Sequence, residues 1–250
     1  LKYTNDYDFI KNNIFEKLVD IITNYSKGID VSDNNIYIDT DNLLVSGTEN
    51  TQNTWMDAKV GDFAVTPRNG KAVEINALWY NALKTLEDLA GKFGENEIAE
   101  NCGIVAKKHK LAFNRKFYND KKECLYDVIG DEKIRPNQLF ALSLTYPVMT
   151  LTNDKARKVL YTCREKLLTK YGLRTLAKED KNYIAVYEGD SFKRDMSYHQ
   201  GITWVWLLGL YNDAEQNLIK ATKEAKIKKE LQEDYDKFKA NVYNTFKKEI

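Results

Sequence analysis

Apolar residues recur at intervals of three and four along most of the chain, a spacing typical of amphipathic helices. Only three prolines interrupt the 250 residues, and each stands where a periodic segment begins or ends. The periodic segments predict seven helices, over residues 7–27, 72–91, 95–117, 137–146, 155–170, 198–211 and 215–248. After the first of them, apolar residues set among Asn, Asp and Gly predict a small β-hairpin near residues 35–46.

The predicted helices are of two kinds. Those that begin near residues 72, 137 and 198 are apolar on most sides, whereas those near 95, 154 and 215 are amphipathic and highly charged. A ring of helical hairpins needs this alternation, with apolar helices inside and charged helices outside. The pattern therefore predicts an all-α single domain over residues 1–250, in which the loops before the inner helices meet on one face.

The charge balance limits the range of partners. With 38 basic and 37 acidic side chains the net charge is +1, so no long-range field favours nucleic acid or a membrane surface. No apolar run is long enough to span a bilayer. Three cysteines without a CxxC spacing and only two histidines argue against a zinc site. We expect a reducing, cytoplasmic environment, no metal and no cofactor.

Aromatic and acidic residues meet in the loop before the first apolar helix. Trp55 provides an indole that can stack on the apolar face of a pyranose, and Asp57 a carboxylate that can serve its hydroxyls or glycosidic oxygen. A structural aromatic beside a capping aspartate is the alternative for this pair. Capping is the favoured role for Glu74 and Asn76 at the start of the next helix.

The loops before the other two apolar helices carry further hydrogen-bonding groups. The second loop holds Asp127, Arg135, Asn137 and Gln138, and the third segment holds Asp195, His199, Gln200 and Trp204. Capping explains Asn137 alone but not four polar groups together, and a satisfied core position is the alternative for His199. The motifs of nucleotide-binding proteins, serine hydrolases and zinc proteases are missing from the sequence.

Taken together, six segments resemble the glucosidase domain of glycogen debranching enzymes, the amylo-α-1,6-glucosidase class, and occur in the family's order. They are TWMDA at 54–58, PRNGKAVEINALWYNAL at 67–83, LYDVI at 125–129, IRPNQLFALSL at 134–144, YGLRTL at 171–176 and YHQGITWVWLLG at 198–209. The resemblance implies an (α/α)6 toroid, here incomplete, and an inverting hydrolysis of α-1,6-glucosidic branch points in glycogen or limit dextrin.

By the same resemblance Asp57 is the general acid, which must be protonated at working pH through burial or a nearby carboxylate. The resemblance also implies substrate-binding roles for Trp55, Arg68, Glu74, Asn76, Trp79, Arg135, Asn137, Gln138, Asp195, His199, Gln200 and Trp204. The family's general base lies in a later ISEI-type segment that this sequence lacks, and a full ring needs more helices. We therefore expect a domain truncated at both ends, with its base beyond Ile250 and no turnover of its own.

Two alternatives stay open. The chain could be a different toroidal glycosidase, acting on trehalose-like or mannose-containing substrates, or a catalytically silent glycan-binding helical module. The expected partner is an α-glucan or another oligosaccharide, and the oligomeric state is left open.

Overall fold

The computed structural model describes residues 1, 3–29 and 35–247, and within these ranges the chain is mostly helical. The helices are α1 (Tyr7–Asn13), α2 (Phe15–Lys27), α3 (Val73–Phe93), α4 (Asn96–Lys116), the 3-10 turn η1 (Pro136–Leu139), α5 (Phe140–Ser143), α6 (Asp154–Lys166), α7 (Ser191–Ser197), α8 (Leu207–Ala221) and α9 (Ala225–Phe246). No helix in the described ranges is long and apolar enough to cross a membrane. The predicted all-α class is confirmed.

Short antiparallel strand pairs connect the helices. They are β1 (Tyr37–Ile38) with β2 (Leu44–Val45), β3 (Lys59–Val60) with β4 (Phe63–Ala64), β5 (Tyr118–Asn119) with β6 (Cys124–Leu125), and β7 (Leu173–Arg174) with β8 (Thr203–Trp204). The first pair is the hairpin predicted near residues 35–46, with Tyr37 opposite Val45. The other pairs were not predicted, because two-residue strands carry no periodic signal.

The predicted helix over residues 198–211 is wrong. The backbone leaves the helical conformation after Ser197, forms β8 beside β7, and returns to a helix only at Leu207. Gly201 shows why: a Cβ there would lie 2.4 Å from the carbonyl oxygen of Ile184, so two backbone segments meet at this glycine. The aromatic run is therefore a loop rather than a buried helix.

Four other predicted helices differ from the structure at their boundaries. The helix expected over residues 155–170 ends at Lys166. The first predicted helix is interrupted at Ile14, between α1 and α2. The short helix expected over residues 137–146 is reduced to η1 and the single turn of α5. The final predicted helix, 215–248, is divided between α8 and α9, and its last residue lies outside the described residues.

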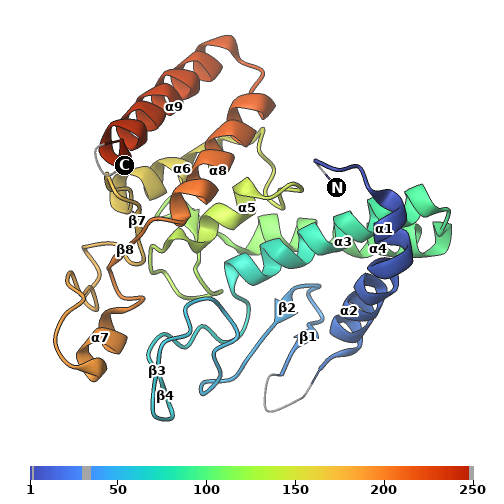
Figure 1. Cartoon of the computed structure of the whole chain (residues 1–250), viewed down its shortest axis with the longest axis horizontal. Helices are drawn as coiled ribbons and strands as arrows, with labels where there is room; N and C mark the ends of the chain where they lie inside the picture. Colours follow the sequence, from blue (N-terminus) through green and yellow to red (C-terminus); the bar gives the residue numbers. More distant parts are fainter. Residues whose placement is uncertain (2, 30–34, 248–250) are drawn as a thin grey trace.

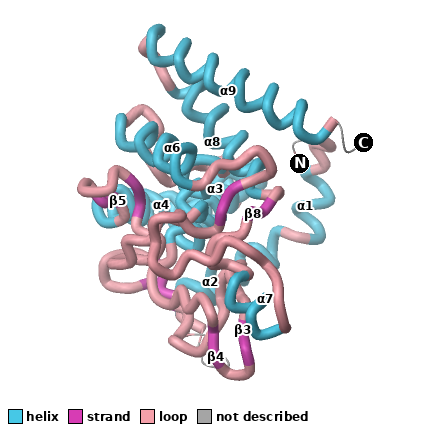
Figure 2. Tube along the Cα trace, turned by 90° about the vertical axis from the view of Figure 1, so that its left-hand side faces the viewer, coloured by secondary structure: helices cyan, strands magenta, loops and turns pink. Residues whose placement is uncertain are grey.

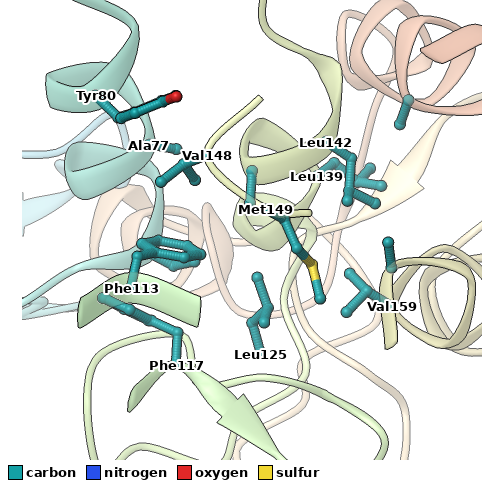
Figure 3. Packing of buried hydrophobic residues seen from close by; sticks show 14 of the residues in the cluster. Ala77, Tyr80, Phe113, Phe117, Leu125, Leu139, Leu142, Val148, Met149 and Val159 are labelled. Atoms are coloured by element: carbon teal, nitrogen blue, oxygen red, sulfur yellow. The ribbon is translucent and has the colours of Figure 1, made fainter. Parts of the chain in front are cut away.

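The core lies between the α3–α4 hairpin and the helices α5, α6 and α8 (Figure 1). Gly94, with φ at 83°, ends α3 in the left-handed conformation and lets α4 return alongside it. At the end of α4, Phe113 stacks on Phe117 with ring centroids 4.3 Å apart, and both face Met149 and Leu125 (Figure 3). Leu139 is fully buried there, which anchors η1 in the core.

The β3–β4 pair and α7 lie at the end of the molecule opposite α9 (Figure 2), whereas β7 lies near the C-terminal end of α9 (Figure 1). The loops that precede α3, η1 and α8 run toward the end that holds the β3–β4 pair and α7. The ring arrangement of the hairpins and the extent of a single domain stay predictions.

Candidate functional site

An aromatic cluster forms where the loop around Trp55 meets residues 198–206. The ring of Trp55 lies edge-on to His199 at 5.1 Å, to Trp206 at 4.9 Å and to Trp204 at 6.3 Å between ring centroids. His199 and Trp204 are stacked at 5.9 Å, and Tyr198 packs against both. Segments more than 140 residues apart in the sequence thus build one surface of indole, phenol and imidazole rings. We call these five residues the aromatic cluster.

A buried ion cluster adjoins the aromatic cluster. It consists of Arg68, Glu74, Asp127 and Arg135. Arg68 donates to both oxygens of Glu74 and to both oxygens of Asp127, and the side chains are at most 2% exposed. Arg135 Nε lies 3.5 Å from Asp127 Oδ2. Burial disfavours the charge of Arg68, but the two carboxylates outweigh it and raise the pKa of the guanidinium. Two cations and two anions leave the cluster without net charge.

Arg135 joins the ion cluster to the third segment. Its Nη1 donates to the carbonyl oxygens of Thr175 at 3.0 Å and His199 at 2.6 Å, and its Nη2 donates to Gln200 Oε1 at 2.9 Å. Because the guanidinium is planar, these bonds fix the relative position of residues 175 and 199–200. Gln200 in turn donates to the carbonyl oxygen of Val65 at 3.3 Å, which returns to the first loop.

His199 is a buried ring without a hydrogen-bond partner among the described residues. It is 1% exposed, and neither ring nitrogen has a partner within hydrogen-bond range. Burial lowers the pKa of His199 to about 4, against the opposing attraction of Asp57, and Arg135 and Arg68 lower it further. The ring is therefore neutral at pH 7. Its Nε2 lies 3.6 Å from Asp57 Oδ1, which is a close approach but too long for a hydrogen bond.

Asp57 lies at the rim of the aromatic cluster with its side chain 64% exposed. Its backbone carbonyl accepts a hydrogen bond of 2.6 Å from Gln52 Nε2, which holds the loop. Burial was one of the two environments expected for this carboxyl group, and the structure does not provide it. The ionisable group that approaches Asp57 is instead the imidazole of His199.

The structure brings most of the predicted site residues together but not all of them. Asn76 bonds through its side chain to the backbone of Leu44 and Ala72 and has no exposed surface. Trp79 is 4% exposed and stacks on Tyr25 at 5.9 Å, within the hydrophobic core. Neither contacts the aromatic cluster, because both side chains point from α3 into the packing with α2 and β2. Their contribution is to the fold.

Two further predicted residues lie at the site with local partners. Gln138 accepts from the Leu125 amide at 3.1 Å and donates to the Arg135 carbonyl at 3.0 Å, so it supports the site from beneath. Asp195 is half-buried on α7, and its carbonyl oxygen accepts from the Tyr198 amide. The C-terminal end of α7 thus provides Tyr198 to the aromatic cluster, and the N-terminal end of η1 provides Arg135 to the ion cluster.

Some residues at the site were missing from the predicted set. The sequence places Asp127 in a polar loop but does not indicate that it pairs with Arg68. Trp206 falls in the run predicted as a buried helix, yet it is 44% exposed. Met56 is buried, with its Sδ 3.5 Å from Asn137 Nδ2. The motifs TWMDA and LYDVI contained the signal for Met56 and Asp127, because both motifs belong to loops that were expected to meet.

Two large grooves of the structure lie away from the aromatic cluster. A groove of about 660 Å³ runs between residues 168–171 and α9, and another of about 590 Å³ lies near Lys122 and Asp180. Neither shares a lining residue with the aromatic cluster. The part of the chain that the structure describes contains no group of three His, Cys, Asp or Glu side chains able to hold a metal ion.

A helical protein whose loops present a carboxylate beside several indole rings has the features of the carbohydrate-active class, since indoles stack on sugars and carboxylates act on glycosidic bonds. A family model for amylo-alpha-1,6-glucosidase matches residues 1–249, and the chain belongs to this family of glycoside hydrolases. The chain is also 28% identical over 231 residues to the glycogen debranching enzyme of Saccharomyces cerevisiae. That match covers 74% of this chain and 15% of the length of the yeast protein.

Proposed function

We propose that the aromatic cluster binds the glucose unit at an α-1,6 branch of a glucan and that Asp57 is the general acid of an inverting hydrolysis. The observation that carries this proposal is the position of the Asp57 carboxyl group at the rim of the cluster, 3.6 Å from the His199 ring. Family membership supports the substrate class.

In the proposed reaction, the carboxylic acid of Asp57 gives its proton to the glycosidic oxygen as the bond to the anomeric carbon breaks. A base removes a proton from a water molecule on the opposite face of the sugar, and the water oxygen bonds to that carbon with inversion. Trp55 provides a flat apolar surface for the ring. Neutral His199 leaves the site without an additional cation that would oppose the oxocarbenium-like charge.

The general base lies outside the buried ion cluster. Glu74 and Asp127 are the cluster's carboxylates, and both are buried and bonded to Arg68. A base must accept a proton from water, and a carboxylate held on both oxygens by a guanidinium has lost that capacity. We propose that the base is a carboxylate outside this cluster, about 6.5 to 9.5 Å from Asp57 as inversion requires.

Replacement of Asp57 by Asn tests the proposal. In the full-length protein, assayed on a branched limit dextrin, Asp57→Asn is expected to lower glucose release by about 10²- to 10⁴-fold, while Asp62→Asn, which changes an exposed carboxylate in the β3–β4 turn, leaves it unchanged. The first product should be the β-anomer of glucose, which NMR detects before mutarotation. Unchanged glucose release from Asp57→Asn, or an initial α-anomer, contradicts the proposal.

The same experiments separate the alternatives. A panel of α-linked disaccharides identifies a glycosidase of different linkage by the substrate it prefers. A silent glycan-binding module would bind oligosaccharide without releasing glucose, and its binding would survive Asp57→Asn but not Trp55→Ala.

A reducing, cytoplasmic location is also part of the proposal. Cys102, Cys124 and Cys163 are buried free thiols in the structure. Burial raises the pKa of the Cys124 thiol to about 11 and that of Cys163 well above its usual range. Thiols that stay protonated react slowly with oxidants and disulfides, so these side chains serve the packing.

A further inference from the structure

The indole of Trp55 is tied to the buried ion cluster through a single side chain, that of Asn137. The Trp55 Nε1 donates to Asn137 Oδ1 at 2.7 Å, and Asn137 Nδ2 donates to Asp127 Oδ1 at 2.8 Å. Asp127 is itself held by Arg68 through bonds of 2.6 and 3.0 Å. We propose that Asn137 is a positioning residue that fixes the Trp55 ring, and with it the loop carrying Asp57, against the ion cluster.

The hydrogen-bond chain has only one possible direction. An indole N–H can only donate, and an ionised carboxylate bonded to Arg68 can only accept. The amide of Asn137 therefore must present its oxygen to Trp55 and its NH₂ to Asp127, because the flipped amide would oppose two donors and two acceptors. An amide side chain provides this acceptor and this donor together, so Asn137 satisfies both partners.

Asn137 holds two consecutive residues of the first loop. Besides the bond to Trp55, its Nδ2 lies 3.5 Å from the sulfur of Met56, which is a weak acceptor. Asp57 follows directly in the sequence, so the exposed candidate acid adjoins a buried and anchored residue. The Asn137 side chain thus joins the Gln52–Asp57 bond and the Gln200–Val65 bond in holding this loop.

Helix capping does not account for the amide. Arg135 occupies the N-cap of η1 and Pro136 its first position, and no side-chain capping bond is formed there. Asn137 is fully buried, so it bonds across the fold instead. The partner Trp55 lies 82 residues away in the sequence.

The comparison with Trp204 shows what is special about Trp55. The indole N–H of Trp204 donates at 3.2 Å to the carbonyl oxygen of Tyr198, a residue of its own segment. Trp55 instead owes its orientation to a residue of η1. Within the proposed function, on which this inference rests for the role of the ring, Trp55 is the sugar platform whose angle another segment sets.

The first test measures the anchor itself. The sequence contains four tryptophans, so a ¹⁵N-labelled protein gives four indole N–H signals, and Trp55→Phe identifies the one from Trp55. Asn137→Leu is expected to shift this signal and to raise its hydrogen-exchange rate by about tenfold or more, since the loss of the bond opens the indole to water. Gln138→Leu removes a neighbouring buried amide and should leave the signal in place. An unchanged signal in Asn137→Leu, or an equal shift in Gln138→Leu, overturns the proposal.

The second test measures coupling at the site with isomaltose, an α-1,6-linked glucose disaccharide, as the probe. Asn137→Leu and Trp55→Phe should each raise the dissociation constant by about three- to tenfold, and the double variant should show no further increase. Trp204→Phe combined with Asn137→Leu should show the product of the two single effects. Multiplicative effects for the Trp55 pair overturn the proposal even if each single variant folds and binds more weakly.

The outcomes keep the two proposals apart. Absence of isomaltose binding by the unaltered protein contradicts the proposed function, and the indole signal then decides alone whether Asn137 anchors Trp55. Where Asn137→Leu does not fold, Asn137→Asp replaces it: the new carboxylate can still accept from Trp55 but repels Asp127. The NMR signal of the Trp55 indole N–H should then shift in the direction opposite to the shift that loss of its hydrogen bond to water causes. An unchanged signal again overturns the proposal that Asn137 anchors Trp55.

Discussion

Removal of the Arg68 guanidinium should lower the free energy of unfolding more than the substitution of a surface residue does. Arg68 makes five hydrogen bonds, to the two carboxyl groups of Glu74 and Asp127 and to the Asp127 carbonyl oxygen. The three side chains are at most 2% exposed, so solvent does not screen what remains. Arg68→Met keeps much of the packing volume but leaves two buried carboxylates near one guanidinium, that of Arg135 at 3.5 Å from Asp127, with the Asn137 amide still bonded to Asp127.

The expected loss in the free energy of unfolding is about 3–5 kcal/mol, the range found when one partner of a buried ion pair is removed. Urea unfolding followed by far-UV circular dichroism measures it. Arg157→Met is the matched control, because Arg157 pairs with the exposed Asp154 on the same helix and should cost only about 0.3–0.5 kcal/mol.

A second substitution tests the cause. Glu74→Gln in the Arg68→Met background removes one of the unpaired charges and should restore part of the lost stability, whereas in the unaltered protein the same change should destabilise. If Arg68→Met costs no more than Arg157→Met, or Glu74→Gln restores nothing, the ion cluster does not hold the loops as the structure indicates.

Further predictions concern pH and two glycines. Because the pKa of His199 is lowered to about 4 from an ordinary 6.5, the unfolded ring binds a proton first, so stability is full above pH 6.5 and falls as the pH drops toward 4. His199→Gln should remove on the order of 3 kcal/mol of this pH dependence, measured as urea midpoints from pH 7 to 4, and an unchanged slope contradicts it. In Gly172→Ala the new Cβ would lie 2.3 Å from the Trp204 carbonyl oxygen, so the melting temperature should fall and the Trp204 indole NMR signal should shift. Gly209→Ala, in open space on α8, should instead stabilise by about 0.5–1 kcal/mol, and equal melting temperatures for the two variants contradict the steric argument.

The long helices were predictable because their burial is periodic. α3 and α4 fill one face with apolar side chains over more than five turns, and their limits differ from the prediction by at most two residues. The helix predicted for the run after Ser197 is wrong for the opposite reason. Its tryptophans and tyrosine are apolar in bulk, but they line a surface, and Gly201 requires a backbone contact that no pattern within the segment encodes.

The ion cluster could be predicted only in part. Arg68, Glu74 and Arg135 were recognised as members of loops that meet, and the two-anion, two-cation balance is consistent with the expectation that buried charges are paired. Which carboxylate faces which guanidinium depends on how η1 packs over α3. That packing is set by apolar side chains such as Leu139, which is fully buried.

Two asparagines show where sequence reasoning about the site ends. Asn76 and Asn137 both follow the start of an apolar helical segment, both fall in segments matching the family, and both are fully buried. Asn76 exchanges its bonds with backbone groups of Leu44 and Ala72, so its loss should weaken the junction of β2 and α3 and leave the aromatic cluster intact. Asn137 bonds to an indole and a carboxylate, so its loss should act on the cluster first. Identity and burial are equal in the two cases, and the difference in function lies wholly in the chemistry of the partners that the fold brings to each amide.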